Sequence, residues 1–314
     1  MDVTNRDHDI FSRNYSNFDQ LDGEIAIVEV DGKEQFFDPG SLYCPYGQLE
    51  WKHTLTGGIR QVVYAGNSIS KKVLGGIAGV DVQNQTVYGT VLATTPSTSY
   101  KDNVRQRVAK LALAQDGSVS GQVQLVYLGQ PALLLRQGEA DTDLAGATKH
   151  FEAVLKDMLP AGMTAQLTNI SSLQDGEKPL ILDFMVHGPA ATVASRHVLL
   201  PSQLFAVNHK QLFVSDTRKY PVYFPYPQVV LDQVNVTLPD GMRVDDLPKG
   251  QSVDDPGVAA YRASAQQAGQ KITFHRMFAL ASIYIEAKDY PKLHDFYSQV
   301  NADDATPAIL ASGK

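Results

Sequence analysis

The chain has 314 residues, 43% of them hydrophobic, and its 27 Lys and Arg against 34 Asp and Glu give a formal net charge of -7 at pH 7. No basic run stands out that could neutralise phosphates, so nucleic acid is excluded as an expected partner. The longest apolar stretches are far shorter than the ~20 residues of a membrane span, so no membrane-spanning helix is expected. The length suits roughly two domains of about 100 to 200 residues each.

Few residue types offer metal or redox chemistry. A single cysteine, Cys44, excludes an internal disulfide and a cysteine-based zinc site. The eight histidines are scattered and form no His-Glu-x-x-His motif, so we expect no metal site and no cofactor. Residues 1–20 are polar and lack the basic and apolar regions of a signal peptide.

A β-hairpin is predicted over residues 24–38. The run 25–30 carries apolar residues on both faces up to Glu29, which indicates a strand that is covered on both sides. Asp31-Gly32 supplies the positive φ angles of a two-residue type I′ turn, so residues 33–37 return antiparallel and place Asp38 at the strand end. Because an isolated hairpin is marginally stable, we expect it to dock on the larger domain or to expose an aggregation-prone edge. Its exposed residues would be Ile25, Ile27, Val28 and Phe36.

The rest of the chain is predicted to be mostly β-strand. Glycines punctuate residues 56–85, which are expected to form a linker with one or two strands, and residues 104–114 and 119–129 form a hairpin around Asp116-Gly117. A helix is expected from Asp141 to Pro160 and another from Tyr290. Other strands are expected at 87–94, 179–188, 196–201, 220–226, 229–239, 257–266 and 270–280. The predicted fold class is mainly β: an antiparallel β-sandwich with one inserted and one C-terminal helix, preceded by the hairpin.

The hairpin resembles the end of a transglutaminase-like, papain-like core, with its DG turn, its aromatic second strand and Asp38-Pro39-Gly40. In that family a Cys nucleophile lies upstream, a His stands on the first strand, and an Asp on the second strand orients the His. The resemblance matches the Asp to Asp38 and puts the His position near Gly23. No histidine lies there and no cysteine precedes the hairpin, so Asp38 is a candidate relic of a catalytic site.

Motifs farther along the chain extend this resemblance: VYGTVLATTP, DGSVSGQV, LTN, LLPSQLF, RKYPVYFPYP, VNVTLPDGMRVDDLP and DYPKLHDFYSQV. Together they are similar to bacterial multidomain proteins with an N-terminal β-sandwich, a transglutaminase-like core and a C-terminal β-sandwich. The resemblance implies a core remnant at 1–55, a linker at 56–85 and a sandwich at 86–314, in a truncated reading frame. It also implies the periplasm or cell envelope as the compartment, with the missing upstream domains or another envelope protein as partner.

Two functional roles compete for the residues around Asp38. A thiol enzyme would use Cys44 as nucleophile, His53 as base and Asp38 as the group that orients the base. Against this, an Asp before Pro-Gly initiates turns, and an isolated Cys is usually a small buried apolar residue. The predicted function is therefore a non-catalytic β-sandwich scaffold or interaction module, and the chain as given is not expected to be an enzyme.

Two groups of aromatic residues suggest a third role, the binding of a glycan or an extended peptide. The first group is Tyr43, Tyr46 and Trp51, and the second is a strip of Tyr220, Tyr223, Phe224 and Tyr226. Either group can instead pack between domains or form an edge strand. Two further motifs indicate turns rather than chemistry: Gly75–Gly79 lacks the Lys-Ser/Thr of a phosphate loop, and Ser118 and Ser120 do not form a nucleophile elbow.

Overall fold

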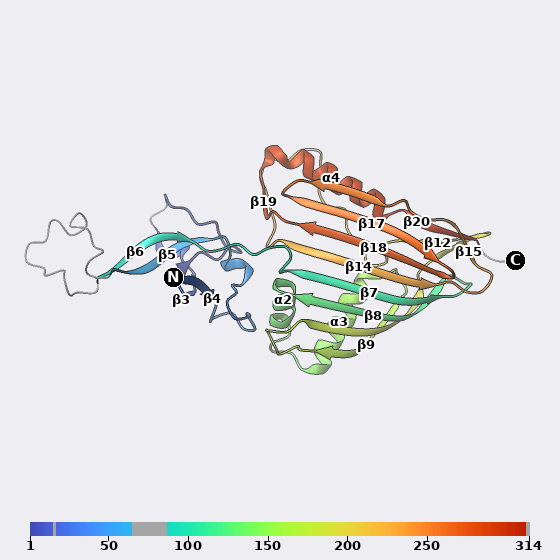
Figure 1. Ribbon diagram of the computed structural model, residues 1–314, viewed down its shortest axis with the longest axis horizontal. Coiled ribbons are helices and arrows are strands. Elements are labelled where there is room, and N and C mark those ends of the chain that lie inside the picture. The colour runs from blue at the N-terminus through green and yellow to red at the C-terminus, as the bar shows by residue number, and fades with distance from the viewer. Residues whose placement is uncertain (15–16, 65–86, 312–314) are drawn as a thin grey trace, which may run out of the picture. The chain divides into compact units, whose positions relative to one another are not determined.

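The computed structural model describes residues 1–14, 17–64 and 87–311. The chain divides into two compact units, Met1–Ser97 and Thr98–Lys314 (Figure 1). Gly57–Tyr64, in the segment expected to be a linker with one or two strands, forms strand β5, and it pairs antiparallel with β6, Val87–Thr94, inside the first unit. Strand pairing therefore joins segments that we expected in a linker and in the sandwich. The Gly75–Gly79 turn lies outside the described residues.

The first unit is built from short strands. A four-stranded sheet has the order β2-β1-β5-β6, with β1 at Asp2–Val3 and β2 at Gly23–Glu24. A separate hairpin pairs β3, Ala26–Val30, with β4, Lys33–Phe37. Two short 3-10 helices, η1 and η2, cover Phe18–Gln20 and Trp51–His53. Among the described residues of this unit, the buried apolar cluster is small and consists of Val3, Ile25 and Leu49.

The hairpin turn follows the sequence prediction, but the covering of its strands does not. Asp31 and Gly32 have φ angles of 51° and 72°, which is the type I′ geometry that Asp-Gly favours. Ile25 is buried beside β3, whereas Val28 is 46% exposed. The prediction of a strand covered on both sides is therefore wrong for the tip of the hairpin. A salt bridge of 2.6 Å between Glu34 and Arg60 ties β4 to β5 within the same unit.

The second unit contains a large sheet of eight strands in the order β16-β17-β18-β14-β7-β8-β10-β9 (Figure 1). Their bounds are β7 Val104–Leu113, β8 Ser118–Leu128, β9 Thr164–Ser171, β10 Leu180–Pro189, β14 Gln228–Thr237, β16 Gln251–Asp255, β17 Ala259–Ala268 and β18 Lys271–Leu280. A smaller sheet has the order β11-β12-β20-β15, formed by Thr192–Ala194, His197–Pro201, Pro307–Ala311 and Arg243–Asp246. A third pairing joins β13, Val222–Tyr223, to β19, Tyr284–Ile285.

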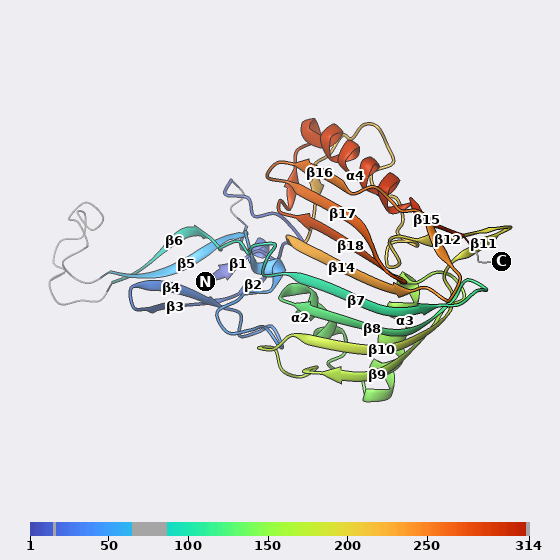
Figure 2. The same cartoon turned by 45° about the vertical axis from the view of Figure 1, so that its right-hand side comes forward.

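Helices add a further layer to the second unit (Figure 2). Helix α3, Leu144–Met158, begins after Asp143, whose side chain accepts from the amide of Gly146 at 2.7 Å, and it ends before Pro160 as predicted. Helix α4 covers Tyr290–Asp304 and follows a 3-10 turn, η3, at Ala287–Asp289. The short helix α2, Gln130–Gly138, was not predicted; it begins with Pro131 near its first position.

The mainly β prediction is confirmed, with two corrections of detail. Two helices, α2 and α3, are inserted where one was expected. The central strands β7 and β14 run parallel, so the large sheet is mixed rather than antiparallel. Strand alternation shows which face of a strand is buried, but it does not show the partner or its direction.

The core of the second unit lies on one face of the large sheet. Along β7 the buried residues Ala109, Leu111 and Leu113 alternate with more exposed ones. This face packs against the smaller sheet and α3, in one cluster that includes Phe151, Leu155, Val198, Leu200, Ala308 and Leu310. A second cluster joins α4 to β17 through Tyr261, Leu293 and Phe296. No helix of the described residues is long and apolar enough to cross a bilayer.

Candidate functional site

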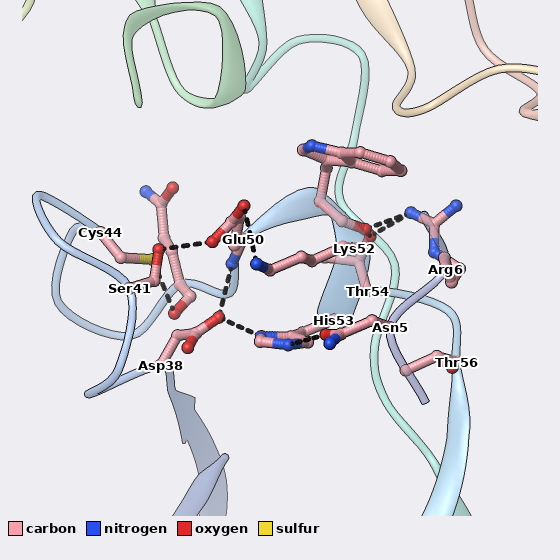
Figure 3. A network of polar contacts seen from close by, with 12 residues as sticks. Asn5, Arg6, Asp38, Ser41, Cys44, Glu50, Lys52, His53, Thr54 and Thr56 are labelled. Atoms are coloured by element: carbon pink, nitrogen blue, oxygen red, sulfur yellow. Dashed lines mark hydrogen bonds and ion pairs between the residues drawn. The ribbon is translucent and has the colours of Figure 1, made fainter. Parts of the chain in front are cut away.

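Asp38 lies directly after β4 and is almost fully buried, with 6% of the residue exposed. Its Oδ2 atom accepts the backbone amide of Glu50 at 3.1 Å and lies 2.5 Å from Nδ1 of His53. His53, in η2, is likewise 6% exposed. The end of the hairpin therefore places Asp38 against the imidazole of His53, fifteen residues farther along the chain, and the two side chains form a buried pair (Figure 3).

Asn5 completes a linear array with this pair. The Nε2 atom of His53 lies 2.5 Å from Oδ1 of Asn5, while Nδ2 of Asn5 donates to the carbonyl oxygen of Asp22 at 3.1 Å. The second bond sets the orientation of the amide, so its oxygen faces the ring. Both ring nitrogens of His53 therefore face oxygen atoms, a carboxylate oxygen on one side and an amide oxygen on the other. We call Asp38, His53 and Asn5 the Asp-His-Asn array.

Gly23 leaves room for this imidazole. A Cβ atom on Gly23 would lie 2.6 Å from Nε2 of His53 and 2.9 Å from Oδ1 of Asn5. These distances are shorter than real Cβ contacts, so any side chain at position 23 displaces the array. The sequence resemblance put the family's histidine near this position. In the structure the ring of His53 fills the space beside Gly23 and contacts Asp38, so an imidazole does lie against the candidate relic.

Polar residues surround the array on the side of Asp38. Ser41 donates to Glu50 at 2.8 Å, and Lys52 lies 3.6 Å from the same carboxylate. The thiol of Cys44 contacts the carbonyl oxygen of Gln48 at 3.4 Å. Figure 3 shows Cys44 and Asn5 at opposite ends of the group, with Asp38 and His53 between them. The thiol therefore lies on the carboxylate side of the ring, away from Nε2.

Arg6 makes several contacts on the side of the array that faces away from Asp38. Its guanidinium donates to the carbonyl oxygen of Trp51 and, at 2.8 Å, to the hydroxyl of Thr54, and it lies over the Trp51 ring at 5.5 Å. The hydroxyl of Thr56 donates to the carbonyl oxygen of Thr4 at 2.8 Å. The first residues of the chain are thus bonded to the segment around η2 at several points.

The structure brings together two of the three residues of the thiol-enzyme hypothesis. Asp38 and His53 form the pair that this hypothesis requires, but the nitrogen that would face a nucleophile faces Asn5. Sequence reasoning missed Asn5, because it precedes His53 by 48 residues and belongs to no motif. A histidine and an asparagine so far apart give no local signal of their contact.

The aromatic candidates are placed in different surroundings. Tyr46 is 71% exposed and packs edge-on against Phe37, with ring centroids 4.8 Å apart. Tyr43 and Trp51 are partly buried. In the strip of the second unit, Tyr220 is 67% exposed and Tyr226 is buried. Tyr223 and Phe224 lie between these extremes, so neither group presents all of its rings to solvent.

In the described part of the chain, no group of three or more His, Cys, Asp or Glu side chains is arranged so that it could hold a metal ion. The chemistry that the array offers is hydrogen bonding between buried groups. The ring of His53 is held between a carboxylate oxygen and an amide oxygen, so neither nitrogen faces a group from which it could take a proton.

These observations define a mainly β protein of two units with a buried Asp-His-Asn array in the first. Residues 196–310 match the model of a domain family of unknown function, DUF3858, which covers less than half of the chain. Among solved structures, the chain is similar to one described as a "putative protease" from Parabacteroides distasonis, with 9% identity and a TM-score of 0.34. That likeness covers 82% of this chain and 40% of the other. No curated protein matches the chain.

Proposed function

We propose that this chain is a non-catalytic β-rich interaction module in which the Asp-His-Asn array is a structural fastening. One observation carries the proposal: His53 has Asp38 on one ring nitrogen and Asn5 on the other, each at 2.5 Å. A general base must present an unprotonated nitrogen to the group that it deprotonates. Here that position is held by a carboxamide oxygen, which has no proton to give and does not act as a nucleophile.

The position of the array in the chain supports a fastening role. Asn5 follows β1, Asp38 follows β4 and His53 belongs to η2, so three segments of the first unit meet at one ring. This unit has a small apolar core of Val3, Ile25 and Leu49. Where the described apolar cluster is so small, buried polar bonds matter more, because each such bond contributes about 1 kcal/mol or more.

A thiol enzyme that uses Cys44, His53 and Asp38 remains the second candidate, favoured by the buried pair of Asp38 and His53. For this chemistry the Cys44 thiol must reach Nε2 of His53 and transfer its proton there. That requires Asn5 to leave the ring and the Cys44 segment to move from the carboxylate side to the opposite side. The first candidate requires neither movement.

Activity assays with a matched variant separate the two candidates. The purified chain is incubated with a glutamine-containing protein and a fluorescent primary amine, and separately with a labelled casein. We expect amine incorporation and proteolysis equal to those of the Cys44→Ala variant. Turnover that disappears in Cys44→Ala and in His53→Ala, but persists in a His8→Ala control, contradicts the non-catalytic proposal.

We further propose that the chain acts in the periplasm or cell envelope, beside upstream transglutaminase-like domains or another envelope protein. The support is the sequence resemblance of the hairpin and of the motifs that follow it. Fractionation of the native cells with an antibody against the chain tests the compartment. Recovery of the protein in the cytosolic fraction alone contradicts it.

A further inference from the structure

A cavity of about 440 Å³ lies in the second unit, between the face of the large sheet, α4 and the segment 209–212. Its volume falls in the range of about 300 to 1,000 Å³ that is typical of small-molecule sites. The register places the sheet residues on one face, since Arg105 of β7 pairs with Val230 of β14, and Val230 with Phe278 of β18. This site is independent of the Asp-His-Asn array.

Two of the cationic groups in the cavity wall are already neutralised. Arg107 makes two bonds to Asp232, of 2.6 and 2.7 Å, and Arg276 makes two bonds to Asp304, both of 2.8 Å. Arg105 and Lys210 also line the cavity. Among the described residues, no carboxylate lies within ion-pair distance of either, so their charges are available to an anionic ligand.

His209 also lines the cavity. The pKa of its imidazole lies below the ordinary value, first because the ring is partly desolvated and then because Arg107 and Arg276 lie nearby, while Asp304 and Asp232 act in the opposite direction.

Two polar atoms of the cavity wall have no partner among the described residues: Nε of Arg105, a donor, and Oε1 of Gln228, an acceptor. Buried polar atoms are normally satisfied. Gln228 lies two residues before Val230 on β14, so it faces the same side of the sheet as Arg105. Both side chains are only partly buried, so a small rotation turns either group toward a ligand.

The remaining wall is apolar. Phe224 and Phe278 line the cavity together with Leu212, Val230, Leu280 and Val300. Tyr226, two residues after Phe224, accepts from Nη2 of Arg105 at 2.9 Å and so holds the guanidinium beside the apolar wall. A ligand that fits this site offers an apolar group next to a carboxylate.

We propose that this cavity binds the C-terminal residue of a peptide. The terminal carboxylate accepts from Arg105 and Lys210, the last backbone N–H donates to Gln228, and an apolar side chain packs against Phe224 and Phe278. A peptide end supplies the acceptor, the donor and the apolar group in one residue. Bonds of this type to a charged group are the strong ones in protein recognition.

Three small probes test the proposal on the full chain by isothermal titration calorimetry and by NMR of the cavity residues. The probes are N-acetyl-L-leucine, its carboxamide N-acetyl-L-leucinamide, and 4-methylpentanoate, which lacks the N–H. We expect N-acetyl-L-leucine to bind in the millimolar range, 4-methylpentanoate to bind several-fold more weakly, and the carboxamide not to bind. Equal binding of acid and carboxamide, or no perturbation of the cavity signals by any probe, overturns the proposal.

Variants identify the groups that bind. Arg105→Met is expected to weaken the binding of N-acetyl-L-leucine at least tenfold, which is about the loss typical of one charged hydrogen bond. Gln228→Met is expected to weaken the binding of N-acetyl-L-leucine but not that of 4-methylpentanoate. Lys210 lies on an exposed segment, so we expect the Lys210→Glu variant to keep the fold and to bind the ligand more weakly. Arg243→Met removes an exposed charge from β15 and serves as the control. Affinity unchanged in both Arg105→Met and Lys210→Glu contradicts the site.

Discussion

The two units bury charged groups in different ways. In the second unit, Arg107, Asp232, Arg276 and Asp304 alternate in charge, and both arginines make paired bonds to carboxylates. In the first unit, a single ring bridges Asp38 and Asn5, and Oδ1 of Asp38 is buried without a hydrogen-bond partner among the described residues. The first arrangement satisfies nearly every donor and acceptor, whereas the second leaves one carboxylate oxygen unsatisfied.

The two arrangements also differ in the elements that hold them. The four-residue cluster is anchored on β7, β14 and β18 and on the end of α4, so rigid elements hold it. The Asp-His-Asn array joins loop ends and a 3-10 helix. Fixed groups on rigid strands suit a structural core, while groups on segment ends resemble the layout of catalytic residues. The third group of the array is an amide, which is not a nucleophile.

The largest effect is expected from Asp232→Ala. This substitution leaves Arg107 without its bidentate partner and removes a carboxylate 3.8 Å from Arg276, inside a buried cluster. The free energy of unfolding of the second unit should fall by about 5 kcal/mol, the upper end for a broken buried pair. Urea unfolding followed by far-ultraviolet circular dichroism measures it. The exposed pair of Arg262 and Asp254 provides the control, since Asp254→Ala should cost at most about 1 kcal/mol. Equal losses in the two variants contradict the importance of the cluster.

The second-largest loss of stability is expected from His53→Ala. It removes the ring from Asp38 and Asn5 but leaves Asp38 the amide donor of Glu50, so the expected loss is about 3 kcal/mol, the lower end for a buried pair. Trp51 is the single tryptophan and lies in the first unit, so its fluorescence reports the unfolding of that unit. His8→Ala, which breaks an exposed pair with Asp22, should change stability little. A loss no larger than that of His8→Ala rules out a fastening role for the array.

Gly23→Ala tests whether the ring needs the space beside position 23. The added methyl group clashes with His53 and Asn5, and we expect a loss of about 1 to 3 kcal/mol, as in overpacked cores. Gly40→Ala is the matched control, because a Cβ atom there meets nothing within 4 Å. In the His53→Ala background the Gly23→Ala substitution should cost much less. An unchanged cost in that background shows that the clash lies elsewhere.

The smallest effect is expected from Asp303→Asn, and it is an increase in the free energy of unfolding. Burial raises the pKa of the Asp303 carboxyl, and the charge of Asp304 raises it further against the hydrogen bond from Tyr261. A carboxyl whose pKa is raised in the folded state is costly to the fold once it ionises, and this cost vanishes as the pH falls below the ordinary pKa. Asp303→Asn keeps an acceptor for Tyr261 at 2.6 Å, so it should stabilise the protein at pH 7 by less than about 1 kcal/mol. Thermal denaturation at pH 7 and pH 3 should show the gain only at pH 7.

Local features of the chain were predictable from sequence, and long-range contacts were not. The Asp-Gly turns, the helix between Asp143 and Pro160 and most strands of the second unit follow from periodicity and capping. The parallel pairing of β7 with β14 is invisible to such patterns, because alternation gives a face and not a neighbour. The candidate site, too, could be predicted only in part from the sequence. Asp38 and His53 were named as candidates, but Asn5 enters through a fold contact that no motif records.

The parallel pairing of β7 with β14 has a consequence for the synthesis of the protein. Arg107 and Asp232, which face each other across these strands, are separated by 125 residues. A ribosome that adds about 5 to 20 residues per second delivers the second strand roughly 6 to 25 s after the first. During that interval β7 is an edge strand whose backbone donors and acceptors await β14, and such an edge pairs readily with other chains. Nascent chains that stall before residue 228 are therefore expected to be the ones that depend on chaperones, and a slow codon run between β12 and β14 should lower the soluble yield.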